Sequence, residues 1–133
     1  MIVDTSAIVA ILKDEPEGLA FSKVMDSAKA VRISAAAYFE SSIVIGKYRD
    51  PVLSAKLDEL IEDANIVIEP VTLEQAQIAR LAYRDFGKGG GHPAGLNFGD
   101  CFSYALARAK REPILFKGDD FVHTDLRPAV GPS

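Results

Sequence analysis

Met1-Ile2-Val3-Asp4-Thr5-Ser6-Ala7-Ile8-Val9 opens the chain, and this stretch decides the fold. Its apolar start predicts a short buried strand over residues 2–4 that ends on the carboxylate of Asp4. We expect Thr5 or Ser6 to cap a helix running to Leu12, because both side chains can accept a hydrogen bond from a first-turn N–H. A strand that delivers an acid at its carboxyl end and turns into a helix is typical of open α/β sheets.

Strand and helix patterns alternate along the rest of the chain. Short apolar segments predict further strands at residues 31–33, 66–70 and 113–116. Helix starts are indicated by Ser34, by Pro51, by Thr72 with Gln75 before residues 73–86, and by Asn97 before residues 98–110. The pattern predicts an α/β fold: a single domain over residues 1–133, with a short parallel central sheet of about 4–5 strands flanked by helices and an irregular tail after about residue 126.

Composition limits the class of protein. The 133 residues are 48% hydrophobic and carry a formal net charge of -4, so the chain can bury one core and lacks the basic footprint of many nucleic-acid-binding proteins. One cysteine, Cys101, excludes an internal disulfide and favours a reducing, cytoplasmic setting. No apolar stretch is long enough to span a membrane, and no basic segment indicates a signal peptide.

Carboxylates recur where strands end and on apolar helices. Asp4 ends the first strand, Glu40 and Asp100 lie in apolar helical segments, and Asp119-Asp120 follow the last strand. Each has an ordinary alternative role: a helix cap, a solvated helix face, a first-turn acid, or a turn residue. Together they favour a pocket for one or two hard divalent cations, Mg²⁺ or Mn²⁺, because buried acids need positive partners.

Four motifs follow one another in the order of a known family. They are Met1-Ile-Val-Asp-Thr-Ser-Ala-Ile8, Tyr38-Phe-Glu-Ser-Ser42, Gly95-Leu-Asn-Phe-Gly-Asp-Cys-Phe-Ser-Tyr-Ala-Leu106, and Leu115-Phe-Lys-Gly-Asp-Asp-Phe121 with His123-Thr124-Asp125. In these motifs the chain resembles the PIN-domain ribonucleases, and among them the VapC-type toxins of type II toxin–antitoxin systems. The resemblance spans nearly the whole chain.

The resemblance implies a single PIN-like domain with Mg²⁺- or Mn²⁺-dependent endoribonuclease activity. Its catalytic and metal-binding acids fall on Asp4, Glu40, Asp100 and the Asp119-Asp120 pair. We favour Asp120 as the fourth acid, because it precedes Phe121 as in the family's closing motif, and Asp119 stays open as a metal ligand. The same pattern implies that Thr5, Ser6 and Asn97 support the acids through hydrogen bonds or contact the phosphate.

The resemblance also implies partners: an RNA substrate, a cognate VapB-type antitoxin and a second copy of the chain in a homodimer. Two other functions compete with the ribonuclease. One is a catalytically silent protein-interaction domain with the same fold, which the full set of acids disfavours. The other is a structure-specific DNA nuclease, whose added helical clamps 133 residues cannot hold.

Overall fold

Strands and helices alternate along the computed structural model, which describes residues 1–130. The strands are β1 (Ile2–Val3), β2 (Val31–Ser34), β3 (Ile66–Glu69) and β4 (Ile114–Leu115). The helices are α1 (Thr5–Leu12), α2 (Gly18–Ser27), α3 (Ala35–Gly46), α4 (Pro51–Asp63), α5 (Leu73–Phe86), the short 3₁₀ helix η1 (Lys88–Gly90) and α6 (Phe98–Lys110). The α/β fold predicted from the sequence is confirmed. Within residues 1–130 no helix is long and apolar enough to cross a membrane.

The four strands form one parallel sheet in the order β3-β2-β1-β4. Ile2 of β1 is opposite Arg32 of β2 on one side and Ile114 of β4 on the other. The first three strands therefore succeed one another in one direction across the sheet, and β4 is added on the far side of β1. This change of direction beside β1 creates a topological switch point.

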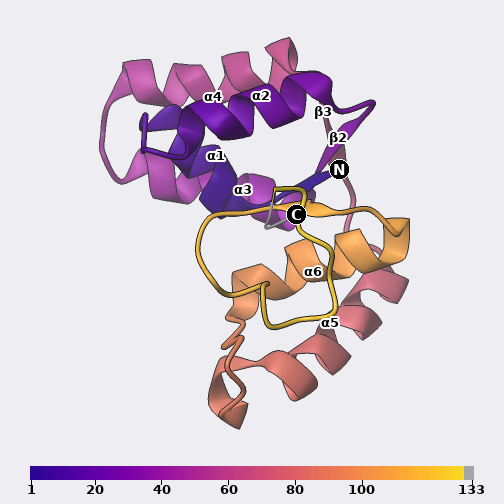
Figure 1. The fold of residues 1–133 in the computed structure, drawn as a ribbon. Helices are drawn as coiled ribbons and strands as arrows, with labels where there is room; N and C mark the ends of the chain where they lie inside the picture. The colour runs from indigo at the N-terminus through magenta and orange to yellow at the C-terminus, as the bar shows by residue number, and fades with distance from the viewer. Residues whose placement is uncertain (131–133) are drawn as a thin grey trace.

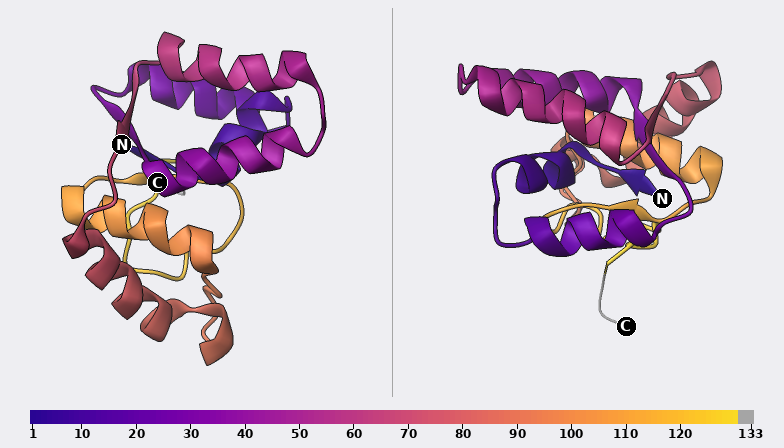
Figure 2. Two further views of the ribbon diagram at one scale, coloured as in Figure 1. Left: turned by 180° about the vertical axis from the view of Figure 1, so that it is seen from behind. Right: turned by 90° about the horizontal axis from the view of Figure 1, so that it is seen from above.

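The sheet separates two apolar cores because successive residues of a strand point to opposite faces. Val3 and Leu115 pack with the helices α1–α4, whereas Ile2 and Ile114 pack with α5 and α6. Figure 1 shows α1–α4 above and α5 with α6 below, and the reverse view of Figure 2 shows the same two groups. Helix α6 packs on β1, β2 and β4, so its position across the sheet is fixed by burial.

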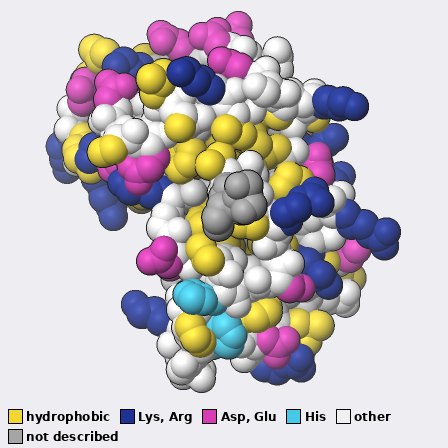
Figure 3. Space-filling view, viewed as in Figure 1, with side chains coloured by type: hydrophobic (Ala, Val, Ile, Leu, Met, Phe, Trp, Pro, Cys, Tyr) yellow, Lys and Arg dark blue, Asp and Glu magenta, His cyan; other side chains and the backbone are white. Residues whose placement is uncertain are grey.

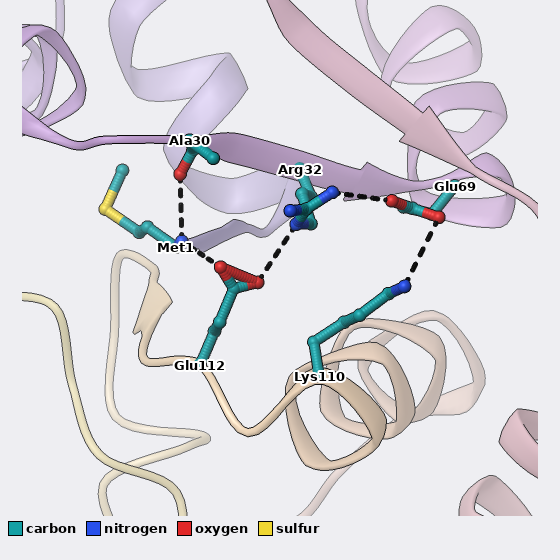
Figure 4. Close-up of polar contacts among 6 residues, drawn as sticks. All are labelled: Met1, Ala30, Arg32, Glu69, Lys110 and Glu112. Carbon is teal, nitrogen blue, oxygen red and sulfur yellow. Dashed lines mark hydrogen bonds and ion pairs between the residues drawn. The ribbon is translucent and has the colours of Figure 1, made fainter.

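A chain of charged groups fastens the C-terminal end of α6 to the strands (Figure 4). The Met1 ammonium donates to Glu112 at 3.0 Å, and the Arg32 guanidinium joins the second oxygen of Glu112, at 3.2 Å, to Glu69, at 2.9 Å. Lys110, the last residue of α6, lies 3.8 Å from the other oxygen of Glu69. These groups are half-buried and alternate in sign, so each carboxylate meets two cations. The opposite end of α6 then lies beside the carboxyl end of β1.

Most helix starts agree with the sequence. Ser34 accepts a hydrogen bond from Ala36 N, Thr72 accepts one from Gln75 N, and Asn97 caps α6. Helix α2 begins at Gly18, with Glu17 as its N-cap. Pro16 therefore precedes the helix and is not part of its first turn.

The segment after residue 126 contains no helix or strand up to residue 130, yet its backbone is paired. Ile114 N donates to Arg127 O at 3.0 Å, and Ala129 N donates to Ile114 O at 2.7 Å. This segment covers the edge of β4 that would otherwise present unpaired backbone groups.

Candidate active site

The acids predicted from the sequence gather at the topological switch point. β1 ends immediately before Asp4, and the neighbouring β4 leads into the loop that carries Asp119 and Asp120. Asp100 lies in the first turn of α6, which packs on β1 and β4. Ligands of open α/β sheets bind outside the carboxyl ends of the strands at such a point.

Asp4 is buried, 3% exposed, and three hydrogen bonds hold its carboxylate. Oδ2 accepts from Ser6 N at 3.0 Å and from Ser6 Oγ at 2.7 Å, and Oδ1 accepts from Ser103 Oγ at 2.6 Å. Asp4 is thus the N-cap of α1, and the expected cap at Thr5 or Ser6 is wrong. The reason is geometric. The Asp4 side chain reaches the free amide of Ser6 in the first turn, so Ser6 donates hydrogen bonds and Asp4 is the capping acceptor.

Asp100 combines a structural bond with an unfavourable charge environment. Its side chain accepts from Asn97 N at 3.1 Å while Asn97 Oδ1 accepts from Asp100 N at 2.9 Å, a reciprocal capping box. The pKa of Asp100 is raised to about 8, first by burial and then by the carboxyls of Asp4 and Asp120, against the lowering effect of the Asn97 N–H. A divalent cation at this place would offset both the cost of burying an ionised carboxylate and the repulsion between the carboxylates.

Glu40 reaches the same turn of α6 from helix α3. A Cβ atom built on Gly99 would lie 2.7 Å from the carboxyl carbon of Glu40 and 2.8 Å from its Oε1. The Glu40 carboxylate therefore lies against the backbone of Gly99, where a glycine leaves room and a helix N-terminus favours negative charge.

The two adjacent acids after β4 differ in their relation to Asp100. Asp119 and Asp120 are both exposed, but only Asp120 is close enough to Asp100 to raise its pKa, within residues 1–130. The next residue, Phe121, is 2% exposed and packs on Phe116, which anchors Asp120 at the loop's base. Lys117 N donates to Ser6 Oγ at 3.0 Å, so the loop is also tied to the hydroxyl that holds Asp4.

The expected supporting residues divide into two groups. Ser6 and Asn97 contact Asp4 and Asp100 directly. The Thr5 hydroxyl instead donates to Ala37 O at 3.1 Å, a bond between α1 and α3 that does not involve the acids.

Two residues of the site were missed by sequence reasoning, Ser103 and Gly99. A signal for Ser103 exists in the sequence: it is a small polar residue three positions after Asp100, on a helix that is otherwise apolar there. For Gly99 we find no local signal, because the contact with Glu40 is created by the packing of α3 on α6.

The donor set fits a hard divalent cation. Carboxylate and hydroxyl oxygens surround the switch point, and such oxygens are the ligands of Mg²⁺ and Mn²⁺. Among residues 1–130 no group of three or more His, Cys, Asp or Glu side chains is arranged so that it could hold a metal ion together. Three such side chains are not required, since Mg²⁺ usually keeps several waters and is bound through one or two carboxylates.

Comparisons with known proteins point to one family. The PIN domain model matches residues 1–126. Ribonuclease VapC28 of Mycobacterium tuberculosis is 59% identical over 130 residues, which are 98% of each chain. Among solved structures, Mycobacterium tuberculosis VapC20, described as a sarcin-ricin loop cleaving toxin, has a TM-score of 0.76 at 17% identity and covers 98% of both chains. A toxin–antitoxin complex from Klebsiella pneumoniae has a TM-score of 0.67 at 14% identity over 90% of this chain and 88% of that one.

We predict that Asp100 makes the metal-free protein lose stability as pH rises. Its pKa of about 8 in the folded chain lies above the ~3.9 of an unfolded aspartate, so the folded state keeps a proton that the unfolded state releases. The stabilising effect of this proton is full below about pH 4 and is lost as pH rises towards about 8. Asp100→Asn keeps an oxygen for the Asn97 N–H and removes the charge.

In EDTA at pH 8 we therefore expect Asp100→Asn to unfold at a higher urea concentration than the wild type. Its free energy of unfolding should be larger by at least about 1 kcal/mol, which corresponds to about one pKa unit. At pH 5 the two proteins should differ less. Equal stabilities at pH 8, or a less stable variant, would contradict the charge argument.

Proposed function

The chain belongs to the PIN-domain family and, within it, to the VapC ribonucleases, and from this we propose that it is a Mg²⁺- or Mn²⁺-dependent endoribonuclease that acts as the toxin of a toxin–antitoxin pair. The observation that supports this most is that Asp4 and Asp100 are both buried at the switch point, where burial and the nearby carboxyls of Asp4 and Asp120 raise the pKa of Asp100. The high identity of VapC28 over nearly the whole chain supports the same reaction class.

The chain's own residues have defined tasks in this proposal. Asp4 and Asp100 would hold the cation, with Glu40 and Asp120 at its flanks and Asp119 further out. Such an ion supplies an activated water and shields the phosphate charge during phosphodiester hydrolysis. Ser6 and Asn97 keep the two principal carboxylates in place through the hydrogen bonds described above.

The protein surface supports a substrate bound chiefly at the ion. In the single view of Figure 3, Lys and Arg side chains lie among Asp and Glu side chains around an apolar area. The formal net charge is -4. A phosphate near the acids would be repelled without a cation, so metal and RNA binding are expected to depend on each other.

The two competing functions make different predictions from this one. A silent interaction domain would cleave nothing, and a DNA nuclease would prefer a branched or nicked duplex to single-stranded RNA. The intact set of acids and the VapC relatives favour the ribonuclease.

We predict that Asp4→Asn and Asp100→Asn each lower the rate of RNA cleavage by more than about 100-fold, since even outer partners of metal ligands cost 10- to 100-fold. The adjacent acids form a matched pair: Asp120→Asn should lose much activity, whereas Asp119→Asn should stay near the wild-type rate. Cleavage of a cellular RNA pool in Mg²⁺ or Mn²⁺, with end sequencing, measures this, and EDTA and DNA substrates serve as controls.

Full activity of either Asp4→Asn or Asp100→Asn would refute the site. If Asp120→Asn kept full activity and Asp119→Asn lost it, the fourth acid would instead be Asp119.

The partner follows from the same acids. We propose that a VapB-type antitoxin inserts an arginine towards Asp4, Glu40 or Asp100, because a guanidinium matches a carboxylate with two parallel hydrogen bonds. The solved toxin–antitoxin complex of the same fold supports a partner of this kind. Arginine binding would replace the cation and block RNA together.

Replacing that arginine by alanine should restore RNA cleavage in the purified complex, or loosen the complex. A lysine variant controls for charge alone, and we expect it to inhibit less than arginine. A complex that stays silent with alanine at every arginine of the antitoxin would show that inhibition uses another route.

Two expectations from the sequence stay predictions. A homodimer is one, and the exposed aromatic residues Phe39 of α3 and Phe98 of α6 are the surface features that suit it. A cytoplasmic location is the other. It agrees with the single cysteine, Cys101, which is buried and whose pKa burial raises to about 11, so the thiol is unreactive.

A further inference from the structure

Ser103 uses its hydroxyl differently from three other helical serines of this chain. Ser27, Ser41 and Ser42 each donate to the carbonyl four residues earlier in their own helix, at 2.8–3.1 Å. Ser103 is fully buried in α6 and donates instead to Oδ1 of Asp4, 99 positions away in the chain, at 2.6 Å. A distance this short is typical of a hydroxyl bonded to an ionised carboxylate.

Counting acceptor positions shows what this bond does to Asp4. An ionised carboxylate offers about four lone-pair positions, two on each oxygen. Ser6 N and Ser6 Oγ fill both positions of Oδ2. The bond from Ser103 fills one position of Oδ1, so one position on that oxygen remains for another ligand.

The spacing of Ser103 relates it to the second acid. Ser103 follows Asp100 by three residues on the same helix, so the two side chains share one face of α6. Asp4 and Asp100 are both buried at this end of the sheet, where two ionised carboxylates repel each other. The bond from Ser103 holds Asp4 beside α6 against this repulsion, and a rigid helix thereby sets the separation of the two carboxylates.

We propose that Ser103 is a positioning residue of the metal site: it fixes the rotation of the Asp4 carboxylate and leaves a single acceptor, on Oδ1, for a divalent cation. This inference rests on the proposed metal-dependent function. Ser103 acts only through Asp4 and contacts neither the substrate nor the cation.

The chain contains a matched control for the test. Ser41 is as fully buried as Ser103 and is also helical, but its hydroxyl donates to Ala37 O at 2.8 Å. Ser103→Ala and Ser41→Ala each remove a hydroxyl oxygen from an equally buried helical position. The two variants differ in that only the hydroxyl of Ser103 bonds to Asp4. Ser103→Cys is a second variant that fills the space with a weak donor.

Mn²⁺ affinity of the purified chain, measured by calorimetry, gives the main readout, with unfolding in EDTA as the check on the fold. We expect Ser103→Ala to weaken Mn²⁺ binding by about 10-fold or more, the usual cost of losing such a partner, and Ser103→Cys to change it in the same direction. Ser41→Ala should bind Mn²⁺ like the wild type. The Mn²⁺ concentration for half-maximal RNA cleavage should rise in Ser103→Ala by a similar factor.

The outcomes separate this inference from the function it rests on. Wild-type protein that binds no Mn²⁺ at millimolar concentration would contradict the metal-dependent function itself. Wild-type protein that binds Mn²⁺, together with Ser103→Ala that binds it equally or more tightly, would overturn the role of Ser103 alone. An equal loss of Mn²⁺ affinity in Ser41→Ala and Ser103→Ala would also overturn it, because the effect would then be one of packing.

Discussion

The repulsion between buried carboxylates is the constraint on which the rest of this structure depends. Asp4 and Asp100 are almost fully covered, and this burial, together with the nearby carboxyls of Asp4 and Asp120, raises the pKa of Asp100. Left to themselves, such groups would separate or stay protonated. Serine hydroxyls, backbone amides and the first turn of α6 hold them together instead.

The architecture serves that arrangement at several levels. The change of strand order beside β1 brings the ends of β1 and β4 together, and the two cores on either side of the sheet fix α1 and α6 against them. The alternating charges around Arg32 and Glu112 fasten the far end of α6. Within residues 1–130 every buried polar side-chain atom has a hydrogen-bond partner, so the acids are embedded in an otherwise satisfied interior.

Local signals in the sequence predicted the elements and most of the acids, and long-range packing explains what they did not predict. Thr72 and Asn97 correctly indicated where their helices begin, because a capping side chain bonds to an amide only two or three residues away in the sequence. The cap of α1 was expected at Thr5 or Ser6 and lies at Asp4. Three residues that can each cap a helix stand side by side there, and only the folded geometry decides among them. Ser103 and Gly99 act on residues of β1 and α3 that are distant in the chain, so their roles follow only from the fold.

The central claim is that the carboxylates at the carboxyl end of β1 form a divalent-cation site for RNA cleavage. Its most direct test is a crystal structure of the chain grown with Mn²⁺, with anomalous scattering used to locate the ion. The account predicts an anomalous peak in contact with Oδ1 of Asp4 and with a carboxyl oxygen of Asp100. Well-ordered Asp4 and Asp100 side chains without such a peak, or Mn²⁺ bound only elsewhere on the surface, would contradict it.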